Sequence, residues 1–115
     1  MNTYLAKLIF NIDIEDSKQT SQFDEQIRLI EAKSLEEAFF KARSIGKQEE
    51  GVFMNAKNKK VNWKFIDVTE LYALKDTKDG EQLYASTHET DDSDAFIQFT
   101  RQKSILIQTN FLTFA

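Results

Sequence analysis

Apolar and polar residues alternate along the first part of the chain in the way that strands of a half-buried sheet require. Over residues 4–15 the even positions are apolar as far as Ile14, whereas polar residues appear among the odd positions. This period of two predicts a strand with one face on a core. A weaker alternation over residues 23–32 places three apolar side chains on one face: Phe23, Ile27 and Leu29. The polar residues 16–22 predict a loop, so we expect the two runs to pair as antiparallel strands.

The period then changes to that of a helix. Ser34 is followed three residues later by Glu37, which is the spacing of a capping box that satisfies two free backbone amides. The apolar residues that follow recur at helical spacing and form one stripe: Leu35, Ala38, Phe39, Ala42 and Ile45. Gly46 stands where a left-handed C-terminal cap is favoured. We therefore predict a helix over residues 35–45, with its stripe on the sheet.

The pattern in the second half of the chain predicts further strands and a C-terminal element that could be a helix or a strand. Residues 52–55 and 61–74 have the composition of strands, and the apolar phase shifts around Asp67, which indicates a bulge. A turn at Asp79 and Gly80 leads into a last predicted strand over residues 83–87. Residues 93–114 fit both a helix and a strand. Because acidic N-cap candidates surround Ser93, we favour a helix that begins near that residue.

Together these elements predict an α+β fold. We expect an antiparallel four- to five-stranded sheet, with the main helix 35–45 packed on one face. A C-terminal segment, helical in the favoured interpretation, completes the core. Because 115 residues is the length of one domain, we predict a single α+β domain over residues 1–115. Residues 89–115 form an acidic linker and an apolar tail within it.

The composition excludes several classes of function. The chain has no cysteine, which removes disulfides, thiolate nucleophiles, thiolate zinc sites and iron–sulfur clusters. Its three glycines are too widely spaced for a nucleotide-binding loop. The net charge of −4 argues against a nucleic-acid partner, and neither a signal peptide nor a membrane-spanning apolar run is visible. We expect a cytoplasmic protein that uses no cofactor and no membrane.

Short blocks of sequence carry a family resemblance. They are YLAKLIF at residues 4–10, IEAKSLEEA at 30–38 and VNWKF at 61–65, followed by the turn DGE at 79–81. With these blocks the chain resembles an uncharacterised family of small bacterial proteins, catalogued as a domain of unknown function. The resemblance covers residues 4–88 and implies a bacterial, cytosolic α+β domain. It carries over no catalytic residue.

One cluster could support catalysis or metal binding. His88 is the only histidine, and carboxylates follow it at Glu89, Asp91, Asp92 and Asp94. Such carboxylates can bind a hard cation, and the imidazole can act as a base. A solvated linker between two elements has the same composition. A small enzyme or metal-binding protein that uses His88 is therefore an alternative to a non-catalytic function.

A second cluster has the composition of a nucleic-acid site. Its basic residues flank the aromatic residues Trp63 and Phe65: Lys57, Lys59, Lys60 and Lys64. Charge and stacking together bind single-stranded nucleic acid. A charged loop before a strand with its aromatic side chains toward the helix explains the same pattern. A weak nucleic-acid-binding module through residues 57–64 is a further alternative.

Some apolar residues lie where the core of a monomer does not need them, and these residues favour an interaction function. Phe40 falls opposite the apolar stripe of the predicted helix, and the tail is rich in apolar residues near the end of the chain. The tail must pack on its own domain or on a second subunit, because exposed it favours aggregation. We predict a non-catalytic interaction module that self-associates, as a homodimer or with an unknown protein partner. The predicted contact residues are Phe40, Ile105, Ile107, Phe111, Leu112 and Phe114.

Overall fold

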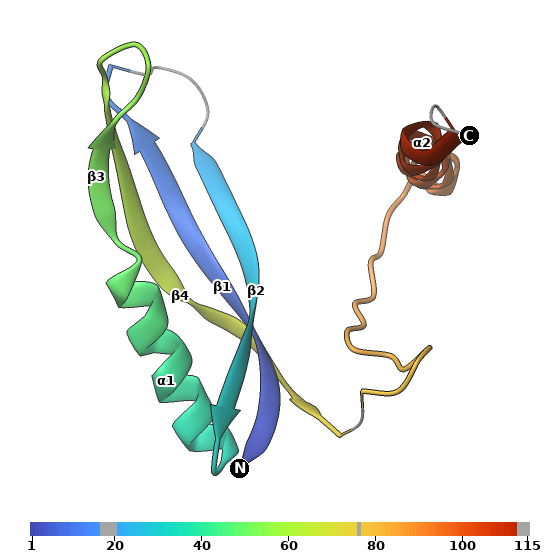
Figure 1. Cartoon of the computed structure of the whole chain (residues 1–115). Coiled ribbons are helices and arrows are strands. Elements are labelled where there is room, and N and C mark those ends of the chain that lie inside the picture. The colour runs from blue at the N-terminus through green and yellow to red at the C-terminus, as the bar shows by residue number, and fades with distance from the viewer. Residues whose placement is uncertain (17–20, 76, 113–115) are drawn as a thin grey trace. The chain divides into compact units, whose positions relative to one another are not determined.

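Four strands and two helices form along the part of the chain that the structure describes (Figure 1). The structure is a computed structural model that describes residues 1–16, 21–75 and 77–112. The elements are β1 (Asn2–Ile14), β2 (Gln22–Ala32), α1 (Leu35–Gln48), β3 (Gly51–Met54), β4 (Lys60–Leu74) and α2 (Ser93–Leu112). The chain divides into two compact units, Met1–Tyr84 and Ala85–Ala115.

The first unit is an antiparallel sheet with one helix. The strand order is β2-β1-β4-β3, and every neighbouring pair is antiparallel. α1 packs against β1, β2 and β4 on one face of the sheet (Figure 1). We call this the inner face and the opposite one the outer face. The predicted α+β class, the antiparallel pairing of the first two strands and the single helix on one face are confirmed.

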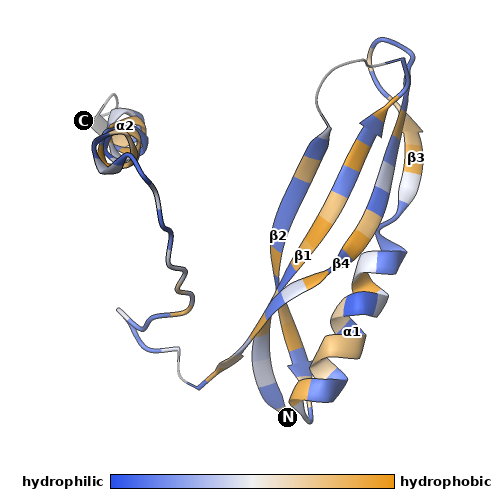
Figure 2. Ribbon diagram, turned by 180° about the vertical axis from the view of Figure 1, so that it is seen from behind, coloured by the Kyte–Doolittle hydropathy of each residue, from blue (hydrophilic) through white to orange (hydrophobic). Residues whose placement is uncertain are grey.

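Alternation along β1 separates the two faces (Figure 2). Its even positions Tyr4, Ala6, Leu8 and Phe10 are buried on the inner face. The register between β1 and β4 shifts between Lys7 and Leu8 and again between Ile9 and Phe10. Ile9 pairs with Asp67 of β4, and the second shift follows this pair directly. The predicted bulge is thereby confirmed, and it lets Phe65 and Val68 both pack with the core.

α1 begins as predicted but ends later. The Ser34 hydroxyl accepts a hydrogen bond of 3.1 Å from the amide of Glu37, which fixes the first turn. The prediction that Gly46 caps the C-terminus is wrong, because the helix continues to Gln48 and Glu49 is the cap. Gly46 is instead buried on the inner face, where a Cβ would meet the Phe65 ring at 2.3 Å. The glycine serves close packing and not a turn.

Small residues bring α1 close to the sheet. The buried positions of the helix are Ala38, Ala42 and Gly46, and Ile45 packs beside them. Leu35, which we placed in the same stripe, is 56% exposed. The aromatic part of the core lies on the strands, where the Phe10 ring centroid is 5.8 Å from that of Trp63 and 5.5 Å from that of Phe65. The helix therefore contributes small side chains to the core, and the strands contribute the large ones.

The prediction of a strand over residues 83–87 is wrong. The turn before it forms, with Gly80 at a φ of 84° and the amide of Glu81 bonded to the carbonyl of Lys78. Residues 83–87 then have no strand conformation. Tyr84 packs its ring on Tyr72 of the outer face, with ring centroids 5.9 Å apart. The segment is thus held by a side chain across the sheet and not by backbone pairing at its edge.

The second unit contains α2, which confirms the favoured interpretation of a helix beginning near Ser93. The Asp92 carboxylate accepts a hydrogen bond of 3.0 Å from the amide of Ala95, so one of the acidic residues caps the helix. The side chains along α2 described by the structure are exposed. Among the described residues, no helix is long and apolar enough to cross a membrane. Docking of this segment on the core stays a prediction.

Candidate functional site

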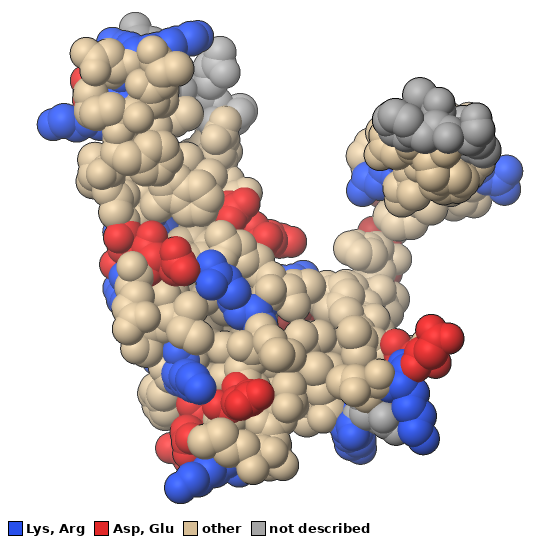
Figure 3. Space-filling model, in the orientation of Figure 1, with Lys and Arg blue, Asp and Glu red and all other residues tan. Residues whose placement is uncertain are grey.

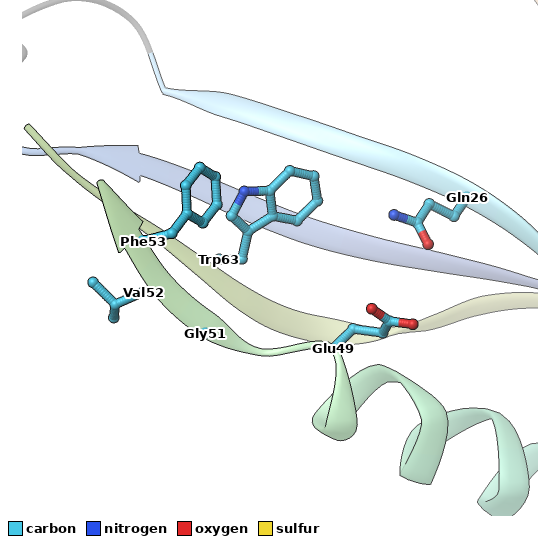
Figure 4. Close-up of a pocket in the computed structure, with 6 residues that line it drawn as sticks. All are labelled: Gln26, Glu49, Gly51, Val52, Phe53 and Trp63. Atoms are coloured by element: carbon cyan, nitrogen blue, oxygen red, sulfur yellow. The ribbon is translucent and has the colours of Figure 1, made fainter. Parts of the chain in front are cut away.

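A groove opens on the inner face because the sheet is longer than its helix. The 14 residues of α1 span about 21 Å, whereas the 13 residues of β1 span about 43 Å. Beyond the C-terminus of α1 the inner face is hollowed into a groove of about 310 Å³. Figure 4 shows the residues that line it: Gln26, Glu49, Gly51, Val52, Phe53 and Trp63. We call this the inner groove.

The inner groove has an aromatic end and a polar end. Phe53 and Trp63 lie next to each other at one end, and Glu49, the C-cap of α1, and Gln26 of β2 point into the space (Figure 4). Arg28 links the two polar residues, because its guanidinium donates to Oε1 of Gln26 at 2.6 Å and to Oε1 of Glu49 at 3.2 Å. The groove can therefore hold a ligand that has both a flat or apolar part and a charged part.

The outer face is an apolar surface. Residues paired across antiparallel strands share a face, and Leu5 of β1 lies opposite Leu29 of β2 and Tyr72 of β4. Leu5 and Tyr72 are partly buried, but the apolar side chains that β2 adds to this face are half exposed or more. They are Phe23 at 62%, Ile27 at 51% and Leu29 at 62%. In a sheet with a helix on one side only, such a face is a candidate interface.

A paired cation lies within the outer face. The Lys7 ammonium is 2.7 Å from a carboxylate oxygen of Glu70 and donates to the Tyr84 hydroxyl at 2.7 Å. Tyr72 donates to the same carboxylate at 2.6 Å. The hydrogen bond from Lys7 lowers the pKa of Glu70, and the hydrogen bond to Glu70 raises the pKa of Tyr72. The polar groups thus satisfy one another, which lowers the cost of covering the surrounding apolar area.

His88 does not gather the neighbouring carboxylates. Its ring centroid lies 5.9 Å from that of Phe96, and Asp92 is engaged with the start of α2. Among the described residues, no three histidine, cysteine, aspartate or glutamate side chains are grouped where they could hold a metal ion. The described residues that we singled out around His88 are therefore not grouped as metal ligands.

The basic and aromatic residues of 57–64 lie on different surfaces. Lys64 pairs with Asn11 on the outer face, and Trp63 pairs with Ile12 on the inner face. The other lysines lie around the β3–β4 loop at the tip of the first unit (Figure 3). Lys59 there bonds to Asp16 at 2.9 Å. The combination of charge and stacking surface that single-stranded nucleic acid requires is thus split between two faces.

The predicted contact residues lie in both units. Phe40 on α1 is 56% exposed and packs edge-on against Phe39, with ring centroids 5.6 Å apart. On α2, Ile105, Ile107 and Phe111 are exposed by 57%, 64% and 58%. Leu112 is the last residue of α2, and its side chain, like the whole of Phe114, lies outside the described part. The sequence analysis did not find Gln26, Glu49 or the Lys7 cluster, although a lysine within an apolar run was a visible signal.

A family model described as "Domain of unknown function (DUF4288)" matches residues 3–85. The chain belongs to the DUF4288 family. The match coincides almost entirely with the first unit, so the DUF4288 domain comprises the sheet, α1, both surfaces described above and Tyr84. α2 lies beyond it. No curated protein and no solved structure matched the chain. The expected resemblance to an uncharacterised family is confirmed.

Proposed function

We propose that this DUF4288 protein is a non-catalytic interaction module that self-associates, with the outer face of its sheet as the main contact surface. The observation that carries the proposal is the row of half-exposed apolar side chains on the face opposite α1. The occupant is a second copy of the chain, related by a two-fold axis. The composition and the family resemblance support a cytoplasmic protein of bacterial origin as part of the same proposal.

The size of the outer face fits a dimer contact. Three long strands spaced by about 4.8 Å cover roughly 14 Å across the sheet. The 11 residues of β2 extend about 36 Å along it. The flat footprint is therefore roughly 500 Å², before the relief of the side chains is added, against about 800 Å² per partner in a standard interface. The face supplies most of the area that a specific dimer needs.

Burial of the outer face alone yields too little free energy for a stable dimer. Full burial of a large apolar side chain yields about 1.5–3 kcal/mol, so the three residues of β2, already partly buried, yield roughly 2–5 kcal/mol together. Association costs at least about 4 kcal/mol in lost freedom of motion. The exposed side chains of α2, among them Ile105, Ile107 and Phe111, are the available source of further burial against the partner copy. We therefore include α2 in the proposed self-association.

Light scattering and sedimentation velocity on the full chain, over a wide range of concentrations, test the proposal. Ile27→Lys puts a charge midway along β2 on the outer face, and Ile107→Lys puts one on α2. Each is expected to weaken dimerisation by at least about tenfold, because burial of an unpaired charge costs more than 1.4 kcal/mol.

Leu35→Lys is the matched control, because Leu35 is as exposed as Ile27 but begins α1 on the other side of the sheet. It should dimerise like the unmodified chain. A chain that stays monomeric at every concentration refutes the proposal. Equal loss of dimer in the Leu35 and Ile27 variants would remove the outer face as the contact surface.

A further inference from the structure

The inner groove lies beside the outer edge of β3, with which no other strand pairs in the described part of the chain. β3 is the last strand of the sheet and pairs with β4 through the register Gly51↔Trp63, Val52↔Asn62, Phe53↔Val61 and Met54↔Lys60. All four residues of β3 are exposed. A strand at the edge of a sheet presents unpaired backbone amides and carbonyls that can receive an added strand. An extended peptide placed there would run directly along the groove.

Gly51 opens the way from this edge into the groove. It lies opposite Trp63, whose side chain is on the inner face. A Cβ built at Gly51 would have nothing within 4 Å. A side chain of an added strand at this level can therefore cross over Gly51 without meeting another side chain of β3. It reaches the space that Trp63 and Glu49 share (Figure 4).

Three features of the groove favour a cation, and one of them, Glu49, already pairs with Arg28. α1 ends at Gln48, immediately before the groove, and the C-terminal end of a helix carries a partial negative charge. The carboxylate of Glu49 adds a full negative charge. The faces of Trp63 and Phe53 attract a cation through their π-electrons, and they also cover the apolar stem of a long basic side chain.

The existing Arg28–Glu49 pair does not close the groove. The two side chains are 35% and 48% exposed and 3.2 Å apart, and an exposed pair of this kind contributes little to stability. Arg28 has a second partner in Gln26. A basic side chain from another molecule can therefore bind Glu49 while Arg28 keeps its bond to Gln26.

We propose that β3 and the inner groove bind an extended peptide segment of a partner protein, which adds a strand at β3 and lays an Arg or Lys side chain across Trp63 to Glu49. This site is on the inner face and is separate from the outer face of the sheet, which is the main surface proposed for self-association. Binding and dimerisation can accordingly be tested independently.

Trp63 is the only tryptophan of the chain, so its fluorescence reports on the groove directly. The probe is the blocked pentapeptide acetyl-Thr-Val-Arg-Val-Thr-amide, titrated into the full chain. We expect a saturable change in Trp63 fluorescence. Replacing the central arginine by neutral, nearly isosteric citrulline should weaken binding by about tenfold, as should Glu49→Gln in the protein. N-methylation of the peptide backbone at the edge-pairing positions should abolish binding.

Glu36→Gln is the matched control, because it removes a carboxylate from the other end of α1 and should leave the affinity unchanged. If the arginine side chain binds Glu49, then Glu49→Gln should leave the affinity for the citrulline peptide unchanged. No saturable change at millimolar peptide, or equal affinity for the arginine and citrulline peptides, would overturn the proposal. Equal affinity for the N-methylated peptide would exclude strand addition.

Discussion

Replacement of Gly46 by alanine sets two opposing effects against each other at one position. Gly46 lies inside α1, where alanine is the better helix former by about 1 kcal/mol. In an exposed helix the substitution would therefore stabilise the protein. Here the new Cβ would lie 2.3 to 2.6 Å from three atoms of the Phe65 ring, which is well inside the contact distance of two carbon atoms.

The overlap is expected to outweigh the gain in helix propensity. Phe65 is 4% exposed and packs against Phe10, so its ring has no free space to move into, and α1 must shift away from the sheet. Forcing extra atoms into a packed core costs about 1–3 kcal/mol. After subtraction of the propensity gain, we expect Gly46→Ala to lower the free energy of unfolding by roughly 1–2 kcal/mol.

Urea denaturation followed by circular dichroism measures this difference. Gly51→Ala is the control, since a Cβ there meets nothing within 4 Å, and it should be neutral or slightly stabilising. The double variant Gly46→Ala/Phe65→Leu should lose less stability than the sum of the losses of the two single variants, because the smaller leucine leaves room for the new Cβ. An alanine variant at Gly46 that is as stable as the unmodified chain would refute the argument that this glycine exists for close packing.

Two further predictions concern single interactions of the first unit. Ser34→Ala removes the hydrogen bond to the Glu37 amide and should cost about 1 kcal/mol, measured by the same denaturation assay; no loss would mean that water caps α1 equally well. The hydrogen bond from Lys7 lowers the pKa of Glu70 in the folded state below its ordinary value of 4.5. The pairing therefore stabilises the fold at a pH above 4.5, and this stabilisation is lost as the pH falls through the folded pKa. Lys7→Met should therefore flatten the decline of stability with acid, and an unchanged pH profile would contradict the pairing.

Period and capping were sufficient to predict most of the fold. β1 keeps a strict period of two, and Ser34 with Glu37 marks the start of α1, because both signals are local properties of the chain. Gly46 was misinterpreted because a glycine late in a helix has two uses, a left-handed cap and a close approach. Only the position of Phe65, about twenty residues later in the chain, decides between them. No local pattern contains that information.

The candidate surfaces were harder to predict for the same reason. Phe23, Ile27 and Leu29 were correctly placed on one face, but alternation does not say which face a helix covers, and they lie on the outer one. The inner groove combines residues from β2, the end of α1, β3 and β4, so it depends on the strand order. The strand predicted over 83–87 failed because Tyr84 is held through its ring and hydroxyl, and backbone propensity does not report such contacts.

Both proposed surfaces follow from one mismatch between a long sheet and a single short helix. α1 covers the inner face only where Ala38, Ala42 and Gly46 allow close contact, and it ends before the sheet does. The rest of the inner face then remains open as a groove that contains Glu49 and the C-terminal end of α1. The outer face keeps apolar residues that α1 does not cover. A second helix in the same unit would have removed one surface or the other. The sheet has the area for two contacts because its three long strands, β1, β2 and β4, are about twice as long as α1.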